Sequence, residues 1–225
     1  SENSAYARAI DFACIFGIMI GDEKGNFNPN STITRAELCV IICKLFNFNV
    51  STYPISQLPP GTHSWAQPYF NACLRESLVI EEWIKSQDDK AKTDDLNSIF
   101  CRYSAHQKEQ KNIPLDVPCP SATPDSLYLT RETCADQIFD FCKEFSSKIT
   151  SVLLSANSTG KVLSEIIQLY QKFDWVRYFL SADDTLIGNV LSSYPTISSE
   201  SLPDTIQIMQ KISDLRKPFL LGAED

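Results

Sequence analysis

A short helix start that occurs twice constrains this chain more than any other feature of its sequence. Residues 33–37 read Ile-Thr-Arg-Ala-Glu, and a weaker copy, Leu-Thr-Arg-Glu-Thr, follows at 129–133. Thr34 and Glu37 have the spacing of a capping box, in which each side chain bonds the backbone N–H of the other residue. The spacing predicts helices that begin near Thr34 and Thr130. Their duplication predicts stacked repeats rather than a fold built around one catalytic pocket.

The arginine inside each helix start is not explained by the cap. At the first helical position a cation opposes the helix dipole, so Arg35 costs some stability unless it faces an anion. Two interpretations remain open at this point. Arg35 is either solvated or paired with a nearby acid such as Asp22 or Glu23, or it holds a carboxylate or phosphate together with the helix N-terminus.

The composition excludes several classes of partner. The chain has 225 residues, is 43% hydrophobic and carries a formal net charge of −8. Such a charge argues against a general nucleic-acid surface, because phosphate binding needs clustered Lys and Arg. No apolar run reaches the length of a transmembrane helix, and residues 1–13 lack the basic start and apolar stretch of a signal peptide. We therefore expect no membrane insertion and no nucleic acid, and any anionic ligand needs a local site.

The apolar spacing predicts a mainly α-helical fold, with weak strand signals throughout. Residues 81–125 are polar and then rich in proline, which indicates an insertion with little regular structure and at most one short helix. Helices are expected near residues 5–20, 34–46, 64–79, 130–145, 147–156, 160–181, 184–193 and 203–216. The core is expected to include Leu38, Ile42, Leu45, Ile138 and Phe141.

The eight cysteines include no Cys-x-x-Cys pair, which argues against a structural zinc site or a thioredoxin-like motif. Cys101 and Cys119 lie in the polar middle segment and are the disulfide candidates. Five others lie in helical apolar patterns and are expected to be buried free thiols. These are Cys14, Cys39, Cys43, Cys134 and Cys142.

Nothing in the sequence favours an enzyme, a metal site or a cofactor. His63 and His106 are the only histidines, and a Cys101–His106 pair lacks an identified third group to orient it. The loop Gly-Asp-Glu-Lys-Gly-Asn at 21–26 has neither the acid spacing of an EF-hand nor the Gly-Lys-Ser/Thr ending of a P-loop.

Several motifs together resemble the S-layer homology domain family. The first repeat, about 1–50, carries Tyr6-Ala7, the Gly-Asn-Phe-Asn-Pro segment at 25–29 and the helix start at 33–37. The second, about 51–146, carries Trp65-Ala66 and the start at 129–131, interrupted by the insertion at about 81–126. Residues 147–225 are expected to form a helical C-terminal region with no recognised counterpart.

The resemblance implies helix–loop–helix repeats that anchor a protein noncovalently to a secondary cell-wall polysaccharide, commonly through pyruvylated sugar, on the surface of a Gram-positive bacterium. Carried over to this chain, it implies ligand contacts at Arg35 and Arg131, at the helix mouth of Thr34, and at Trp65 and Tyr6, which are otherwise core residues. Tyr6 replaces the usual Trp, and no third Thr-Arg-Ala-Glu motif is present. The alternative is a structural or protein-interaction scaffold, with another chain as partner and no bound glycan.

Overall fold

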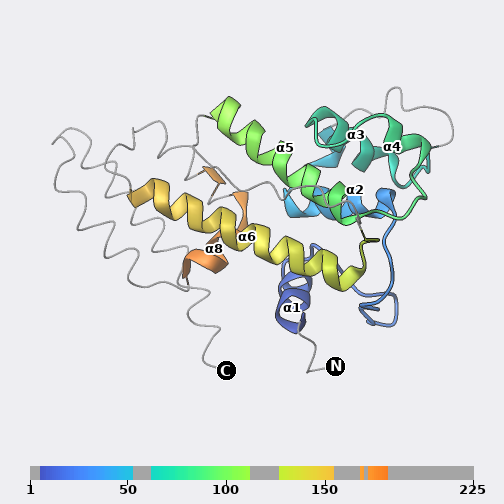
Figure 1. Cartoon of the computed structure of the whole chain (residues 1–225), viewed down its shortest axis with the longest axis horizontal. Coiled ribbons are helices and arrows are strands. Elements are labelled where there is room, and N and C mark those ends of the chain that lie inside the picture. The colour runs from blue at the N-terminus through green and yellow to red at the C-terminus, as the bar shows by residue number, and fades with distance from the viewer. Residues whose placement is uncertain (1–5, 53–61, 112–126, 155–167, 170–171, 182–225) are drawn as a thin grey trace. The chain divides into compact units, whose positions relative to one another are not determined.

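The chain is mainly helical, as its apolar spacing predicts (Figure 1). The computed structural model describes residues 6–52, 62–111, 127–154, 168–169 and 172–181. Within these residues, extended backbone pairs only at isolated bridges. The helices are α1 (Ala7–Ile15), α2 (Arg35–Leu45), the 3-10 turn η1 (Val50–Thr52), α3 (Gln67–Arg75), α4 (Glu82–Lys85), α5 (Thr93–Lys111), α6 (Arg131–Leu154) and α8 (Asp174–Ser181).

The chain divides into two compact units. The first comprises residues 1–105 and 118–141, and the second comprises 106–117 and 142–225. Helices α5 and α6 begin in the first unit and end in the second. In the second unit an aromatic cluster is buried, with the ring centroid of Trp175 5.6 Å from that of Phe145 and 5.0 Å from that of Phe173. Both Thr-Arg helix starts lie in the first unit.

The centre of the first unit is a ring of three extended segments, each leading into a helix. Bridges join residues 32 with 130, 34 with 90, and 92 with 128. At the middle of the segments the N–H of Ile33 donates to the carbonyl of Leu129 (3.1 Å), Leu129 to Ala91 (2.8 Å), and Ala91 to Ile33 (2.9 Å). All three side chains are buried. The three hydrogen bonds therefore close a cycle in which each segment satisfies the next.

A second set of backbone hydrogen bonds joins the same three segments in the opposite direction, from donors two residues further along each segment. The first helical N–H of α2, from Arg35, donates to Asp89 (3.0 Å), that of α5, from Thr93, to Leu127 (3.0 Å), and that of α6 to Ser31 (2.9 Å). The first N–H groups of a helix have no partner inside the helix. Here a neighbouring segment accepts them, so α2, α5 and α6 begin in equivalent environments.

The expectation of little regular structure at residues 81–125 is wrong, because α5 alone has 19 residues within this segment. The sequence hides its start, since Lys92 and Thr93 stand where the other starts have Thr and Arg. The Asp95 carboxylate still accepts the N–H of Lys92 at 2.9 Å, which preserves half of a capping box. The start of α5 is therefore set by this cap and by the hydrogen bonds between the three extended segments, without a Thr-Arg motif.

Three further expectations about helix boundaries have different outcomes. α1 ends at Ile15 rather than near residue 20, because the chain turns at Gly17 (φ +62°) and buries Ile18 and Met19. The helices expected at 130–145 and 147–156 are one continuous helix, α6. The helices expected at 184–193 and 203–216, and most of 160–173, lie outside the described residues.

The expected core residues are confirmed. Leu38, Ile42, Leu45, Ile138 and Phe141 are all buried. Aromatic rings then join the three equivalent helices. The ring of Phe46, directly after α2, stacks on Tyr103 of α5 with centroids 3.6 Å apart, and Phe100 of α5 stacks on Phe141 of α6 at 4.1 Å.

The cysteines largely follow the sequence analysis. Cys39, Cys43, Cys134 and Cys142 are buried free thiols, and burial raises the pKa of Cys134 to about 12. Cys14 is exposed, contrary to expectation. Helix α1 buries the face that carries Ala9, Phe12 and Ala13, and Cys14 lies outside that face. Cys101 is disulfide-bonded, and the other candidate, Cys119, lies outside the described residues.

Shortening Ile33 should destabilise the first unit severely. The side chain is 1% exposed at the centre of the ring, so Ile33→Ala leaves a cavity and should lower the free energy of unfolding by about 2–5 kcal/mol. Ile15→Ala is the matched control, because Ile15 is 72% exposed and its loss should change stability by less than about 0.5 kcal/mol. Guanidinium unfolding measures both, and equal effects would contradict the role of the ring.

The thiols should divide sharply in a labelling experiment. In the native protein a maleimide should modify Cys14 within minutes, and the buried Cys39, Cys43, Cys73, Cys134 and Cys142 only slowly, because they are shielded and burial disfavours their thiolates. In denaturant all six should react at similar rates. Peptide mass mapping identifies each site. Rapid native labelling of Cys134 would contradict the packing of α6.

Candidate functional site

A pocket of about 370 Å³ opens in the first unit, between the segment after α1, helix α2 and the start of α3. Its floor is apolar, with Ile18, Met19 and Ile41. Ile20 and Val40 add further apolar surface, and the lining also includes two aromatic side chains, two cations and one acid. These are Trp65, Tyr69, Arg131, Lys44 and Glu37. A concave apolar surface with a few polar groups is the usual form of a small-ligand site.

Arg131, at the first position of α6, holds the loop of residues 20–27 against the pocket. Its Nε donates to the carbonyl of Phe27 at 2.7 Å, and its Nη2 donates to the carbonyl of Ile20 at 2.6 Å. The guanidinium carbon lies 4.8 Å from the centroid of the Phe27 ring. A guanidinium has five N–H donors, so three of them have no partner in the described part of the chain. Arg131 is therefore oriented by the protein and can still donate to a ligand.

The loop that Arg131 grips has its own internal order. The Asp22 carboxylate accepts the N–H groups of Lys24 and Asn26, both at 2.9 Å, and the side-chain amide of Asn28 at 3.1 Å. These hydrogen bonds, that from the Asn26 N–H first, lower the pKa of Asp22. Gly21 is required here, because a Cβ at this position would lie 2.9 Å from the carbonyl carbon of Gly25.

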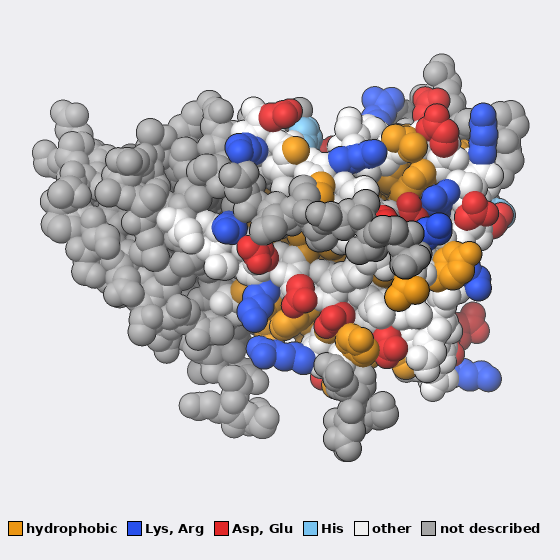
Figure 2. Space-filling view, viewed as in Figure 1, with side chains coloured by type: hydrophobic (Ala, Val, Ile, Leu, Met, Phe, Trp, Pro, Cys, Tyr) orange, Lys and Arg blue, Asp and Glu red, His pale blue; other side chains and the backbone are white. Residues whose placement is uncertain are grey.

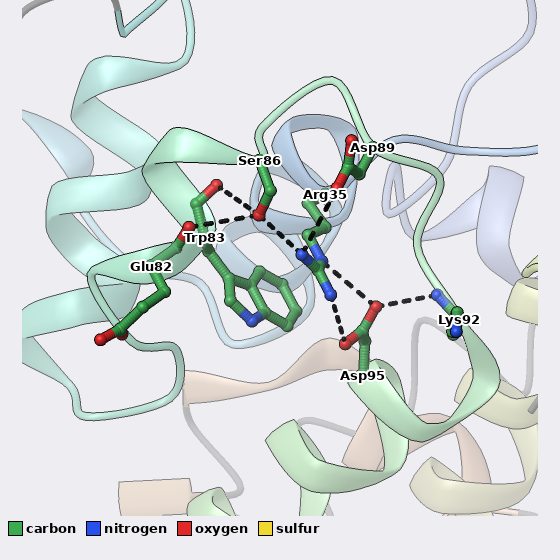
Figure 3. A network of polar contacts seen from close by, with 7 residues as sticks. All are labelled: Arg35, Glu82, Trp83, Ser86, Asp89, Lys92 and Asp95. Carbon is green, nitrogen blue, oxygen red and sulfur yellow. Dashed lines mark hydrogen bonds and ion pairs between the residues drawn. The ribbon is translucent and has the colours of Figure 1, made fainter. Parts of the chain in front are cut away.

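Arg35, at the equivalent position of α2, has an acceptor at every guanidinium nitrogen (Figure 3). Its Nη1 donates to Ser86 Oγ at 2.6 Å, while Nε and Nη2 each face a carboxylate oxygen of Asp95 at 3.4 Å. Asp89 lies 4.0 Å from Nη1, and the guanidinium carbon is 5.1 Å from the centroid of the Trp83 ring. Arg35 thus has acidic partners, but they are not the nearby Asp22 and Glu23 that the sequence suggested.

The two arginines occupy matching positions and make matching contacts. Each lies over an aromatic ring from a segment distant in the sequence, which is Phe27 of the loop after α1 for Arg131 and Trp83 of helix α4 for Arg35. The third equivalent position is Thr93, whose hydroxyl donates to the carbonyl of Leu127 at 3.3 Å. Each of these side chains therefore fastens its helix start to a neighbouring segment.

The remaining candidate residues differ in their availability. Trp65 is 51% exposed at the pocket, and its ring lies parallel to that of His63, which bonds Asp88 at 2.7 Å. Thr34 accepts the N–H of Glu37 within a complete capping box, so its hydroxyl is committed to the helix. Tyr6 is half-buried directly before α1 and does not line the pocket.

Among the pocket residues that sequence reasoning did not identify as ligand contacts are a second cation, Lys44, and a second aromatic residue, Tyr69. Lys44 is exposed in the last turn of α2 and has no side-chain partner among the described residues. Tyr69 follows Trp65 by four residues, about one helical turn, and both side chains line the pocket. Lys44 follows Glu37 by seven residues, two helical turns, so helix periodicity around the capping box could have identified it.

Comparison with known proteins adds one family. Residues 1–39 match the model of the S-layer homology domain, and they cover α1, the Asp22 loop and the start of α2. No curated protein matches the chain. In the part of the chain that the structure describes, no group of His, Cys, Asp and Glu could hold a metal ion, and no helix is long and apolar enough to cross a membrane.

The loop should loosen in acid. Because the folded pKa of Asp22 is depressed, its contribution to loop order is complete above the unfolded value near 3.8 and is lost as the pH falls through the lower, folded value. In an NMR titration the carboxyl of Asp22 should therefore have a midpoint below 3.8, and the amide signals of residues 24–28 should move with it. A midpoint at or above 3.8 would contradict the hydrogen bonds that the carboxylate accepts.

Proposed function

Residues 1–39 are similar to the S-layer homology domain, a family whose members generally act as cell-wall anchoring modules, and from this premise we propose that the chain anchors a surface protein noncovalently. Its ligand is an acidic cell-wall polysaccharide, such as a pyruvylated glycan. The ligand binds in the pocket formed by Arg131, Trp65 and Lys44. The protein acts at the cell surface and is not itself an enzyme.

The chemistry of the pocket is the observation that carries this proposal. Arg131 is held by two backbone carbonyls and keeps free N–H groups, which suit a carboxylate because a guanidinium can donate two parallel hydrogen bonds. Lys44 supplies a second cation, and Trp65 and Tyr69 supply flat apolar faces for a sugar ring. The pocket therefore offers both charged and flat apolar contacts, which suit a charged sugar.

The charge of the whole chain makes this local arrangement necessary. With a formal net charge of −8 the protein repels polyanions at a distance, so an acidic ligand must be recognised at short range. Figure 2 shows acidic and basic side chains interspersed over the described part of this face, without one extended basic patch. A small site with two cations fits these conditions better than a broad electrostatic surface.

The disulfide at Cys101 supports a location outside the cytoplasm. Disulfides persist in oxidising compartments, which include the cell surface, and are rare where thiols are kept reduced.

The proposal assigns a role to each candidate residue from its contacts. Arg131, Lys44 and Trp65 contact the ligand, whereas Arg35 and Thr34 hold helix α2 in place and Tyr6 supports α1.

Substitutions at the pocket should weaken binding without unfolding the protein. Trp65→Ala should reduce the affinity for pyruvylated cell-wall polymer about tenfold, or about 1.4 kcal/mol, by removing a half-exposed aromatic face. Lys44→Ala should reduce it about three- to tenfold through the loss of one charged contact. Co-sedimentation with purified cell-wall sacculi, before and after chemical removal of the secondary polymer, measures both effects.

Ile15→Ala is the matched control, because it removes an exposed side chain that does not line the pocket. It should bind as wild type. If the wild-type protein binds sacculi equally with and without the polymer, or binds neither, the anchoring proposal fails. The scaffold alternative would then replace it, with another protein chain as the partner.

A further inference from the structure

We infer that Asp95 occupies the ligand face of Arg35, so that the second arginine site of this module is closed by the protein's own carboxylate. The inference rests on the proposed function, because it concerns which arginine is left to meet an acidic sugar. It predicts that Arg131 serves the anionic ligand and that Arg35 does not, although both begin equivalent helices.

The equivalence of the two sites makes their difference informative. Arg35 and Arg131 occupy the same position at the starts of α2 and α6, and each backbone N–H is accepted by a neighbouring segment. Each guanidinium lies over an aromatic ring, at 5.1 Å for Arg35 and 4.8 Å for Arg131. The surroundings of the two side chains are therefore alike. Which guanidinium N–H groups stay available to a ligand depends on the acceptors nearby.

Those acceptors differ in kind. At Arg131 they are two backbone carbonyls, which are neutral and form no ion pair with the guanidinium. At Arg35 they are the Ser86 hydroxyl and both oxygens of Asp95, with Asp89 at 4.0 Å. Every nitrogen of the Arg35 guanidinium thus has an acceptor, and the pair of oxygens facing Nε and Nη2 is the arrangement that a ligand carboxylate would adopt.

The difference arises from the acid at the third position of the neighbouring helix, which is α2 for Arg131 and α5 for Arg35. Glu37 lines the pocket near Arg131, but its Oε2 accepts both the N–H of Thr34 at 2.7 Å and the Thr34 hydroxyl at 3.2 Å. Asp95 is the equivalent acid of α5. It accepts only one donor of its own cap, the N–H of Lys92, because lysine has no hydroxyl to offer. The Asp95 carboxylate is left to turn toward Arg35.

Burial strengthens this closure. The side chain of Arg35 is 22% exposed and that of Asp95 is 14% exposed, so the pair is shielded more than an ordinary surface pair. An incoming carboxylate would have to displace Asp95 and would also meet the charge of Asp89. Like charges at such short range oppose binding.

The first test measures the closure without any polysaccharide. Phenylglyoxal modifies arginine side chains that are accessible and not ion-paired, and peptide mass mapping follows each site. Arg35 should react at least about tenfold faster in Asp95→Asn than in wild type, while the rate at Arg131 should be unchanged. Asparagine keeps an oxygen for the Lys92 N–H and removes only the charge. An unchanged rate at Arg35 would overturn the inference.

Asp95→Thr provides a second variant if Asp95→Asn destabilises α5. The protein already uses this solution at the equivalent position of α6, where the Thr133 hydroxyl accepts the N–H of Thr130 at 3.0 Å. The introduced threonine side chain has no carboxylate to face the guanidinium of Arg35, so this variant should expose Arg35 to phenylglyoxal as Asp95→Asn does. Protection of Arg35 in both folded variants would overturn the inference.

The second test uses pyruvylated cell-wall polymer. Arg131→Ala should reduce binding at least about tenfold, and adding Asp95→Asn to that variant should recover a measurable part of it through Arg35. Adding Arg35→Ala should remove the recovery. No recovery by Asp95→Asn, in a chain whose wild type binds the polymer, overturns this inference alone. Failure of wild type to bind overturns the proposed function, and the labelling result then still decides whether Asp95 shields Arg35.

Discussion

The cycle of hydrogen bonds between Ile33, Ala91 and Leu129 is the constraint on which the rest of the first unit depends. Buried N–H and carbonyl groups must be paired, and three short extended segments meet that requirement only by pairing with one another. Once they do, the directions of α2, α5 and α6 are fixed, because each helix begins directly after its segment. The first helical N–H groups then reach the neighbouring segments, and the aromatic rings along the helices can stack. A change at this ring should therefore be felt throughout the unit.

The same constraint explains why arginine is tolerated at the first position of a helix. A cation there opposes the helix dipole, but the ring brings another segment of the chain across the helix start. Arg131 meets carbonyls of Ile20 and Phe27, and Arg35 meets Ser86 and Asp95. The local cost is offset by contacts that join segments distant in the sequence. Two equivalent positions thus acquire different charge environments, and this difference separates a side chain available to a ligand from one committed to the fold.

For an acidic chain to bind an acidic polymer, as proposed, its available cations must be gathered in one place. Arg131 and Lys44 come from two helices far apart in the sequence, and Trp65 precedes a third helix. The ring brings α2 and α6 together, and α3 packs against α2, so that all three sides of the pocket depend on tertiary contacts. The alternative function, a structural or protein-interaction scaffold, needs no such pocket. It is equally consistent with Arg35, which is paired with Asp95, and with Thr93, which stands where the other two helix starts have arginine. Polymer binding at Trp65 therefore separates the two functions.

The sequence by itself determined the local elements of this protein. The capping box at Thr34 and Glu37, its copy at Thr130, the apolar stripe of α2 and most buried thiols follow from spacing and residue type, which act over a few residues. The tertiary structure alone decided what depends on distant neighbours. It revealed the third helix start at Thr93, where no motif marks the cap, and it paired Arg35 with an acid 60 residues away. It also placed Lys44 and Arg131 in one pocket. Such contacts are set by the closing of the ring, and no short stretch of sequence contains both partners.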